Sequence, residues 1–238
     1  MLKLNSNQLK NIALVTMTID HIGYILYPDV FILRVIGRLA FPIYAYFIAQ
    51  GIRNTSNESK YLLRMVSFAV ITQIAFFLFQ IDFINVLFTF SLAIIGLMGI
   101  RREQYWIAPF VLLVAYFLNS DYSYFGILVV YIFYFLENKK ILRFILLFFS
   151  ITFFILEANL NFDMNIVYQL YIYRAYNYDL IARILVEFFA LLALPLLDLY
   201  DHKRIQYTDL KEKLVNQYFF YIYYPLHLVI LKLLEGVI

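Results

Sequence analysis

Nine long apolar stretches, separated by short polar gaps, run through the whole of this 238-residue chain. Hydrophobic residues make up 64% of the sequence and the mean hydropathy is +0.78, far above the values of a soluble domain. A helix that crosses a bilayer needs about 20 apolar residues, so nine such helices with short loops account for the full length. The pattern predicts an all-α integral membrane protein, a single polytopic bundle over residues 1–238 with the lipid bilayer as its surroundings.

The hydropathy pattern also predicts where these helices lie. The first apolar stretch has no small-residue cleavage site, so we expect it to remain as a span and not to be removed as a signal peptide. The Asn- and Tyr-rich segment 158–179 is too polar to span. We expect it to be either a re-entrant or surface-lying segment that covers a cavity, or a plain outer loop. The predicted spans are 9–27, 31–50, 61–79, 84–100, 104–118, 123–136, 141–157, 180–197 and 215–234.

The basic residues are distributed unevenly between the two sets of gaps. One side collects 14 of the 19 Lys and Arg residues, because all except Arg34, Arg38, Arg174, Arg183 and Lys232 fall there. Cytoplasmic loops are enriched in Lys and Arg, so the N-terminus is predicted to be cytoplasmic and the C-terminus outside. The net charge of +3 reflects this bias, and no nucleic-acid partner is expected.

Several kinds of chemistry are excluded by the residues that the sequence lacks. Cysteine is absent, which rules out disulfides, thiolate nucleophiles and cysteine-ligated metals. No Walker loop, GxSxG elbow, HExxH or CxxC motif occurs. The three histidines include no closely spaced pair, so no metal site is expected.

Four predicted spans carry ionisable side chains at similar depths, roughly 9–13 Å from the outer end at ~1.5 Å per residue. Such groups are costly in a membrane and are candidates for function. If the four helices pack together, one polar cavity forms in the outer half of the membrane. The groups are Asp20 and His21, Arg34 and Arg38, Arg183 and Glu187, and His227.

Each group also has a structural interpretation. Asp20 and Arg38 suit a buried ion pair that fixes helix packing, and Arg183 with Glu187 suits a self-satisfied pair four residues apart. Arg34 is close enough to the boundary to reach the membrane surface. A histidine in a membrane is often only hydrogen-bonded to a neighbour. The functional alternative is a histidine base with an arginine that stabilises an oxyanion, which indicates acyl or phosphoryl transfer.

Several sequence blocks resemble the TraX family. They include IDHIG at 19–23, LRVIGRLAFPIYAYFIAQGIRNT at 33–55, KYLLRMVSFAVITQIAF at 60–76, NVLFTF at 85–90, DYSYFGILVVYIFYFL at 121–136 and QYFFYIYYPLHL at 217–228. TraX is a membrane enzyme that acetylates the amino terminus of a pilin. The resemblance implies a multi-pass protein of the bacterial cytoplasmic membrane, with acetyl-CoA or another acyl-CoA as cosubstrate and a peptide or pilin-like acceptor as partner.

The chain is also similar, more distantly, to the type-three membrane acyltransferases, which carry one functional histidine in the first span and another histidine motif in a late span. His21 matches the first position, and His227 matches a YPxH motif. We expect His21, oriented or charge-balanced by Asp20, to take the proton of an acceptor amine or hydroxyl, and Arg38 to stabilise the oxyanion. His227 is either the alternative base or a second proton acceptor.

The phosphates of acyl-CoA are expected to meet basic side chains on the cytoplasmic side, although the positive-inside bias alone is the more common reason for basic residues there. The candidates are Arg53, Lys60, Arg64, Arg101 and Arg102. Two other functions fit the same cavity. One is a transporter or exporter that uses it as a substrate or proton site, against which the odd span number and the absence of a repeat argue. The other is a non-catalytic assembly or immunity protein.

Overall fold

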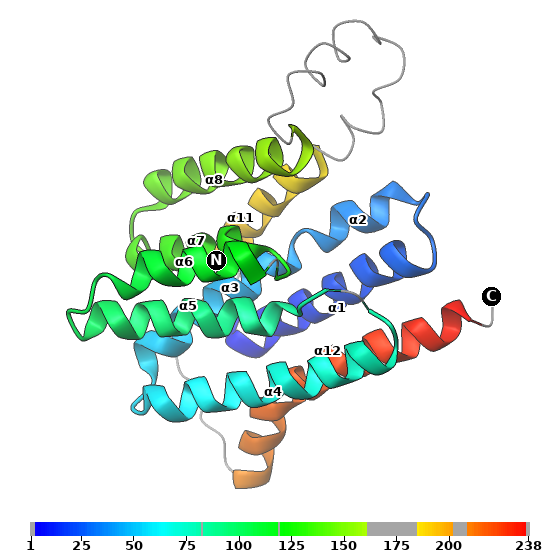
Figure 1. Cartoon of the computed structure of the whole chain (residues 1–238), viewed down its shortest axis with the longest axis horizontal. Coiled ribbons are helices and arrows are strands. Elements are labelled where there is room, and N and C mark those ends of the chain that lie inside the picture. Colours follow the sequence, from blue (N-terminus) through cyan, green and yellow to red (C-terminus); the bar gives the residue numbers. More distant parts are fainter. Residues whose placement is uncertain (1–2, 82, 119, 161–184, 202–208, 237–238) are drawn as a thin grey trace, which may run out of the picture.

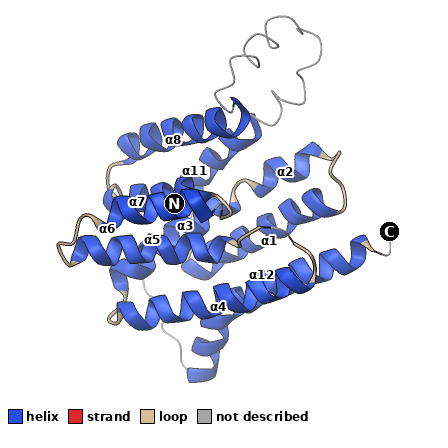
Figure 2. Cartoon of the chain, viewed as in Figure 1, coloured by secondary structure: helices blue, strands red, loops and turns tan. Residues whose placement is uncertain are grey.

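The computed structural model describes residues 3–81, 83–118, 120–160, 185–201 and 209–236. Within these residues the chain is helical and contains no strand, as the sequence predicts (Figure 2). The helices are α1 (Ser6–Ile25), α2 (Phe31–Gly37), α3 (Ala40–Asn54), α4 (Glu58–Leu78), α5 (Val86–Arg101), α6 (Ile107–Leu118), α7 (Ser123–Phe135), α8 (Lys140–Leu160), the 3-10 helix η1 (Phe189–Leu192), α11 (Ala193–Asp198) and α12 (Leu210–Glu235).

Every predicted span coincides with helix in the described part of the chain, and two of them are interrupted. The second span is divided into α2 and α3, and the eighth contains η1 and α11. The polar segment predicted at 158–179 lies almost wholly outside the described residues, as do Arg174 and Arg183. Two helical stretches, Phe31–Asn54 and α4, are long and apolar enough to cross a membrane.

The helices run back and forth, so that successive connections lie at opposite ends of the bundle (Figure 1). We call one the basic end, where the connections 55–57, 102–106 and 136–139 lie, and the other the cavity end, with 26–30, 79–85 and 119–122. Consecutive helices from α4 to α8 pack as neighbours, and α12 packs against both α1 and α4. The last helix is therefore placed beside the first, which brings distant parts of the sequence together.

Asparagine side chains start three of the long helices. Asn5 and Gln8 form a reciprocal capping box before α1, with both hydrogen bonds at 2.9 Å. The side chain of Asn57 accepts from the backbone N–H of Lys60 at 2.8 Å, and that of Asn85 accepts from Leu87 at 3.1 Å. These caps satisfy backbone donors that the first turn of a helix leaves free.

The break between α2 and α3 has a clear cause in the sequence. Pro42 is the third residue of α3, and proline has no N–H to donate to the carbonyl of Arg38 four residues earlier. Its ring would also clash with that carbonyl in a continuous helix. The helix therefore ends at Gly37 and restarts at Ala40, which leaves Arg38 at the discontinuity.

Two glycines let α1 and α2 approach closely. A Cβ atom on Gly37 would overlap the carboxylate of Asp20, and a Cβ on Gly23 would lie 2.7 Å from that of Leu33. The helix pair can form only because both positions lack a side chain. This approach holds Asp20 and His21 of α1 beside Arg34 and Arg38.

Candidate active site

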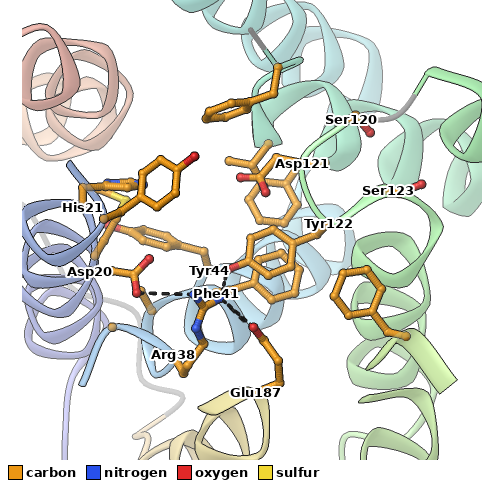
Figure 3. A pocket seen from close by; sticks show the side chains of 18 of the residues that line it. Asp20, His21, Arg38, Phe41, Tyr44, Ser120, Asp121, Tyr122, Ser123 and Glu187 are labelled. Carbon is orange, nitrogen blue, oxygen red and sulfur yellow. Dashed lines mark hydrogen bonds and ion pairs between the residues drawn. The ribbon is translucent and has the colours of Figure 1, made fainter. Parts of the chain in front are cut away.

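A cavity of about 650 Å³ lies between the helices near the cavity end, and its size is within the range of small-molecule sites (Figure 3). Its walls come from α1, α2, α3, α5, α6, α7, α8 and α12, together with Phe83, residues 120–122 and Glu187. The lining includes Asp20, His21, Arg38 and Glu187, together with Asp121 and Tyr122. Side chains from distant parts of the sequence thus meet in one chamber.

The two histidines singled out in the sequence are in direct contact. Nδ1 of His21 lies 2.7 Å from Nε2 of His227, and the two ring centroids are 4.9 Å apart. His227 is buried and does not line the cavity, whereas His21 does. His227 therefore stands behind His21 with respect to the cavity.

The hydrogen bonds fix which ring nitrogens carry protons when both histidines are neutral. Nδ1 of His227 donates to the backbone carbonyl of Tyr223 at 2.9 Å, because a carbonyl can only accept. Its Nε2 is then an acceptor, so Nδ1 of His21 must donate to it. Within the described residues Nε2 of His21 has no hydrogen-bond partner and, in this tautomer, carries the lone pair of a base.

Arg38 lies between two carboxylates on the floor of the cavity (Figure 3). It is 3.6 Å from Asp20, 3.3 Å from Glu187 and 3.3 Å from the hydroxyl of Tyr122. Only 9% of its side chain is exposed. The ion pair expected between Asp20 and Arg38 is present, but Asp20 also binds Arg34.

In the described residues, two of these charges bind partners that the sequence did not indicate. The side chain of Arg34 is 26% exposed, and its guanidinium donates to the Asp20 carboxylate at 2.9 Å and to the Asp20 carbonyl at 3.2 Å. Glu187 pairs with Arg38 from another helix, and Arg183, its expected partner, lies outside the described residues. Both differences arise because the α2–α3 break and the close α1–α2 contact bring arginines towards carboxylates across helices, which spacing along one helix does not show.

The connection between α6 and α7 supplies cavity residues that we did not single out. Tyr122 and Ser123 have positive φ values of 58° and 40°, which non-glycine residues rarely adopt. The Tyr122 ring stacks on Phe41 with centroids 3.8 Å apart, and Asp121 lines the cavity beside it. Backbone strain of this kind is concentrated at functional sites. In the sequence, the one feature that could have pointed to these cavity residues is the block DYSYFG, which begins at Asp121.

The five basic residues proposed for acyl-CoA lie near the basic end, away from the cavity, and do not form one cluster. Arg53 is ion-paired with Glu137, and Glu58 binds both Arg101, at 2.9 Å, and Arg102, at 3.6 Å. Lys60 is exposed. Arg64 lies over the rings of Tyr61 and Tyr221, with its guanidinium 5.4 and 5.9 Å from their centroids.

Comparison with known proteins gives a family. The family model described as "TraX protein" matches residues 5–235. An uncharacterized protein of Rickettsia prowazekii is 39% identical over 66 residues, which cover 28% of this chain and 25% of that protein. A probable fimbrial assembly protein, FimC of serogroup H1 from Dichelobacter nodosus, is 35% identical over 109 residues, or 38% of this chain and 44% of that protein. The chain thus spans less than half the length of these relatives, and no solved structure matches it. Since the family model covers nearly the whole sequence, including both histidines and Arg38, this chain belongs to the TraX family.

Proposed function

We propose that this protein is an acyltransferase of the bacterial cytoplasmic membrane that moves an acetyl or other acyl group from acyl-CoA to an amine or hydroxyl. The observation that carries the proposal is the His21–His227 pair, which leaves Nε2 of His21 as a base beside a cavity large enough for a substrate. The cavity supplies the chamber that acyl transfer needs, and Arg38 supplies a positive charge within it.

The outer surface of the bundle supports a membrane location. Large apolar side chains on α4, α6 and α8 face outwards, and Phe77, Phe117 and Ile141 are 81%, 76% and 80% exposed. Soluble monomers rarely expose contiguous apolar surface of this kind. A multi-pass arrangement in a bilayer would place these side chains against lipid.

In the proposed reaction Nε2 of His21 takes a proton from the acceptor as the acceptor's nitrogen or oxygen bonds to the thioester carbon. The carbonyl oxygen becomes an oxyanion. When it collapses, the carbon–sulfur bond breaks, the proton passes from His21 to the sulfur, and CoA leaves as the free thiol. The reaction needs only two proton transfers through His21 and one positive charge near the oxyanion, and it forms no covalent enzyme intermediate.

Arg38 can provide that stabilisation because its present contacts are loose. Charge-assisted N–H···O bonds are typically about 2.7–2.9 Å long, whereas the contacts of Arg38 with Asp20, Glu187 and Tyr122 measure 3.3–3.6 Å. The guanidinium is therefore not committed to one carboxylate and can turn a donor towards a developing oxyanion.

A site for the donor's phosphates is suggested by two cations within the bundle near the basic end. Lys10 lies over the rings of Phe47 and Phe220, and Arg64 lies close enough for the two charges to repel each other. Neither has an acidic partner within ion-pair distance in the described part of the chain, and Nε of Arg64 is buried without a hydrogen-bond partner there. Both side chains are half-buried, and neighbouring charges of one sign that are partly removed from water are costly without a counter-ion, which a phosphate group would supply.

Lys10 is placed to bind a donor that reaches His21. Eleven residues make close to three whole helical turns, so both side chains lie on one face of α1, about 17 Å apart along the axis at ~1.5 Å per residue. The pantetheine arm of CoA is about as long as four extended residues, or roughly 14 Å. Phosphates at Lys10 and Arg64 would therefore bring the thioester to the cavity.

The acceptor we propose is a peptide that is exported or held in the membrane. The fimbrial assembly role named for the Dichelobacter relative makes a pilin or pilin-like peptide the first candidate. Such an acceptor would enter the cavity from the end opposite to the donor's phosphates.

The test is acyl transfer by the purified protein in lipid nanodiscs, with radiolabelled acetyl-CoA and a peptide that has a free amino terminus. His21→Ala should lower the transfer rate by about 10²–10⁴-fold, the usual contribution of a general base. His202→Ala, which alters the third histidine of the chain, is the control. Transfer within a few-fold of wild type in His21→Ala would exclude His21 as the base, and movement of unmodified peptide into liposomes would favour a transporter.

A further inference from the structure

Among the described residues that line the cavity, the carboxylates outnumber the cations by one. Its charged lining residues are Asp20, Asp121 and Glu187 against Arg34 and Arg38. Both arginines are ion-paired with Asp20 or Glu187, and Asp121 has no ion-pair partner among the described residues. An unmatched negative charge facing a chamber indicates a ligand with a positive charge.

The walls around Asp121 are also suited to a cation. Tyrosine rings present an electron-rich face that attracts ammonium groups. Their hydroxyls can accept hydrogen bonds from the same group. Six tyrosines line this cavity: Tyr24, Tyr44, Tyr116, Tyr122, Tyr124 and Tyr224.

Asp121 is held at this position by its backbone. Its N–H donates to the carbonyl of Ile84 at 2.8 Å, and its carbonyl accepts from the hydroxyl of Thr89 at 2.6 Å. The positive φ values of Tyr122 and Ser123 follow immediately. The fold therefore fixes Asp121 at the cavity wall across from His21 (Figure 3), at the cost of strained backbone.

We propose that Asp121 binds the amino group of the acceptor as an ammonium ion and takes the first proton from it. This inference rests on the proposed acyl transfer. The ammonium passes one proton to the Asp121 carboxylate, from which it leaves to cavity water. The neutral amine then attacks the thioester carbon and gives its second proton to His21, which returns it to the departing sulfur. The products are an amide, the free thiol of CoA and one proton released to water.

The chemistry of Asp121 suits that exchange. Burial raises its pKa to about 7, while the positive charges of Arg38 and Arg34 oppose the rise and Asp20 adds to it. A carboxyl group with this pKa can accept and release a proton close to neutral pH. An ordinary surface aspartate remains ionised there and could only bind the ammonium.

The test compares two acceptors that differ in one group. One is a short alanine-initiated peptide, and the other carries lactate in place of that alanine, so that a hydroxyl replaces the ammonium. Wild type should prefer the amine, and Asp121→Asn should raise KM for the amine about 10²-fold while changing KM for the lactyl peptide less than threefold. Asp121→Glu should recover part of the preference for the amine peptide that Asp121→Asn loses. The control Asp29→Asn removes an exposed carboxylate from the connection between α1 and α2 and should change neither value.

Binding of both peptides without acyl-CoA, measured by calorimetry in nanodiscs, separates the two proposals. If wild type binds the amine peptide more tightly than the lactyl peptide, and Asp121→Asn loses this preference, the ammonium site is supported even when no acyl transfer is observed. A lack of transfer would then count only against the proposed acyltransferase activity. Equal binding of the two peptides by wild type would overturn the ammonium site whether or not transfer occurs. Thermal melting of each variant shows that it is folded, and the wild-type comparison of the two peptides decides the question if Asp121→Asn does not fold.

Discussion

At the scale of single residues, the division of labour between the two histidines follows from one backbone contact. The carbonyl of Tyr223 fixes the proton of His227 on Nδ1, which makes Nε2 of His227 an acceptor for His21. Partners of this kind orient a working imidazole and stabilise its protonated form. His227 is thus a positioning residue in the proposed mechanism, and His21 is the residue that meets substrate.

Two substitutions at position 227 separate orientation from packing. His227→Gln places an amide oxygen near the position of Nε2, where it can accept from His21, so transfer should fall less than about tenfold. His227→Leu fills the space without an acceptor and should lower kcat by about 10–100-fold, with a changed pH profile because the His21 imidazolium loses its partner. Rates and thermal melting of both variants check this. Equal losses in the two variants, with lowered melting temperatures, would indicate that His227 only packs.

Residue identity predicted which side chains come together better than it predicted how they pair. Asp20, His21, Arg38 and His227 stood out because ionisable groups inside apolar stretches are conspicuous. Which carboxylate binds Arg34, and which helix supplies a partner for Arg38, is decided by contacts between helices. A single sequence does not show these contacts. Asp121 could not be singled out by this criterion because it lies in a polar connection, where an aspartate is unremarkable.

At the scale of the helices, hydropathy located nearly all of them, because 15–20 apolar residues in a row leave few alternatives to a helix. It did not show the break between α2 and α3, because the residues on both sides are equally apolar. Pro42 marks that break, and the break gives Arg38 its place between Asp20 and Glu187. The contact between α1 and α2 depends likewise on a local feature, the missing side chain of Gly37.

Gly37→Ala tests that contact. The added methyl group would overlap the Asp20 carboxylate, so Asp20 and its arginine partners must move or α2 must separate from α1. We expect a loss of about 1–3 kcal/mol in stability and a transfer rate at least tenfold lower. Gly236→Ala is the matched control, since its nearest atom to a new Cβ, the carbonyl oxygen of Leu233, is 3.6 Å away. Normal melting and activity in Gly37→Ala would show that the helix pair adapts easily.

At the scale of the whole molecule, the two ends of the bundle carry different charge patterns. Near the basic end, Arg53, Arg101 and Arg102 are bound to Glu137 or Glu58, and these pairs fasten helices together. Lys10 and Arg64 lie between α1, α4 and α12 without such partners in the described residues. The described lining of the cavity, by contrast, has one carboxylate more than it has cations. A donor with phosphates and an acceptor with an ammonium group would thus approach from opposite ends and meet at His21.

This polarity predicts a kinetic difference between two acyl donors. Lys10→Gln and Arg64→Gln should each raise KM for acetyl-CoA about tenfold or more with kcat little changed, because they remove a charge that binds phosphate and leave the reacting groups intact. KM for acetyl-pantetheine, which has the same thioester but no phosphate, should change less than twofold. Lys139→Gln, at an exposed lysine of the basic end, is the control for general loss of positive charge. Equal effects on both donors would place the nucleotide elsewhere, since only a site that contacts the phosphates distinguishes the two compounds.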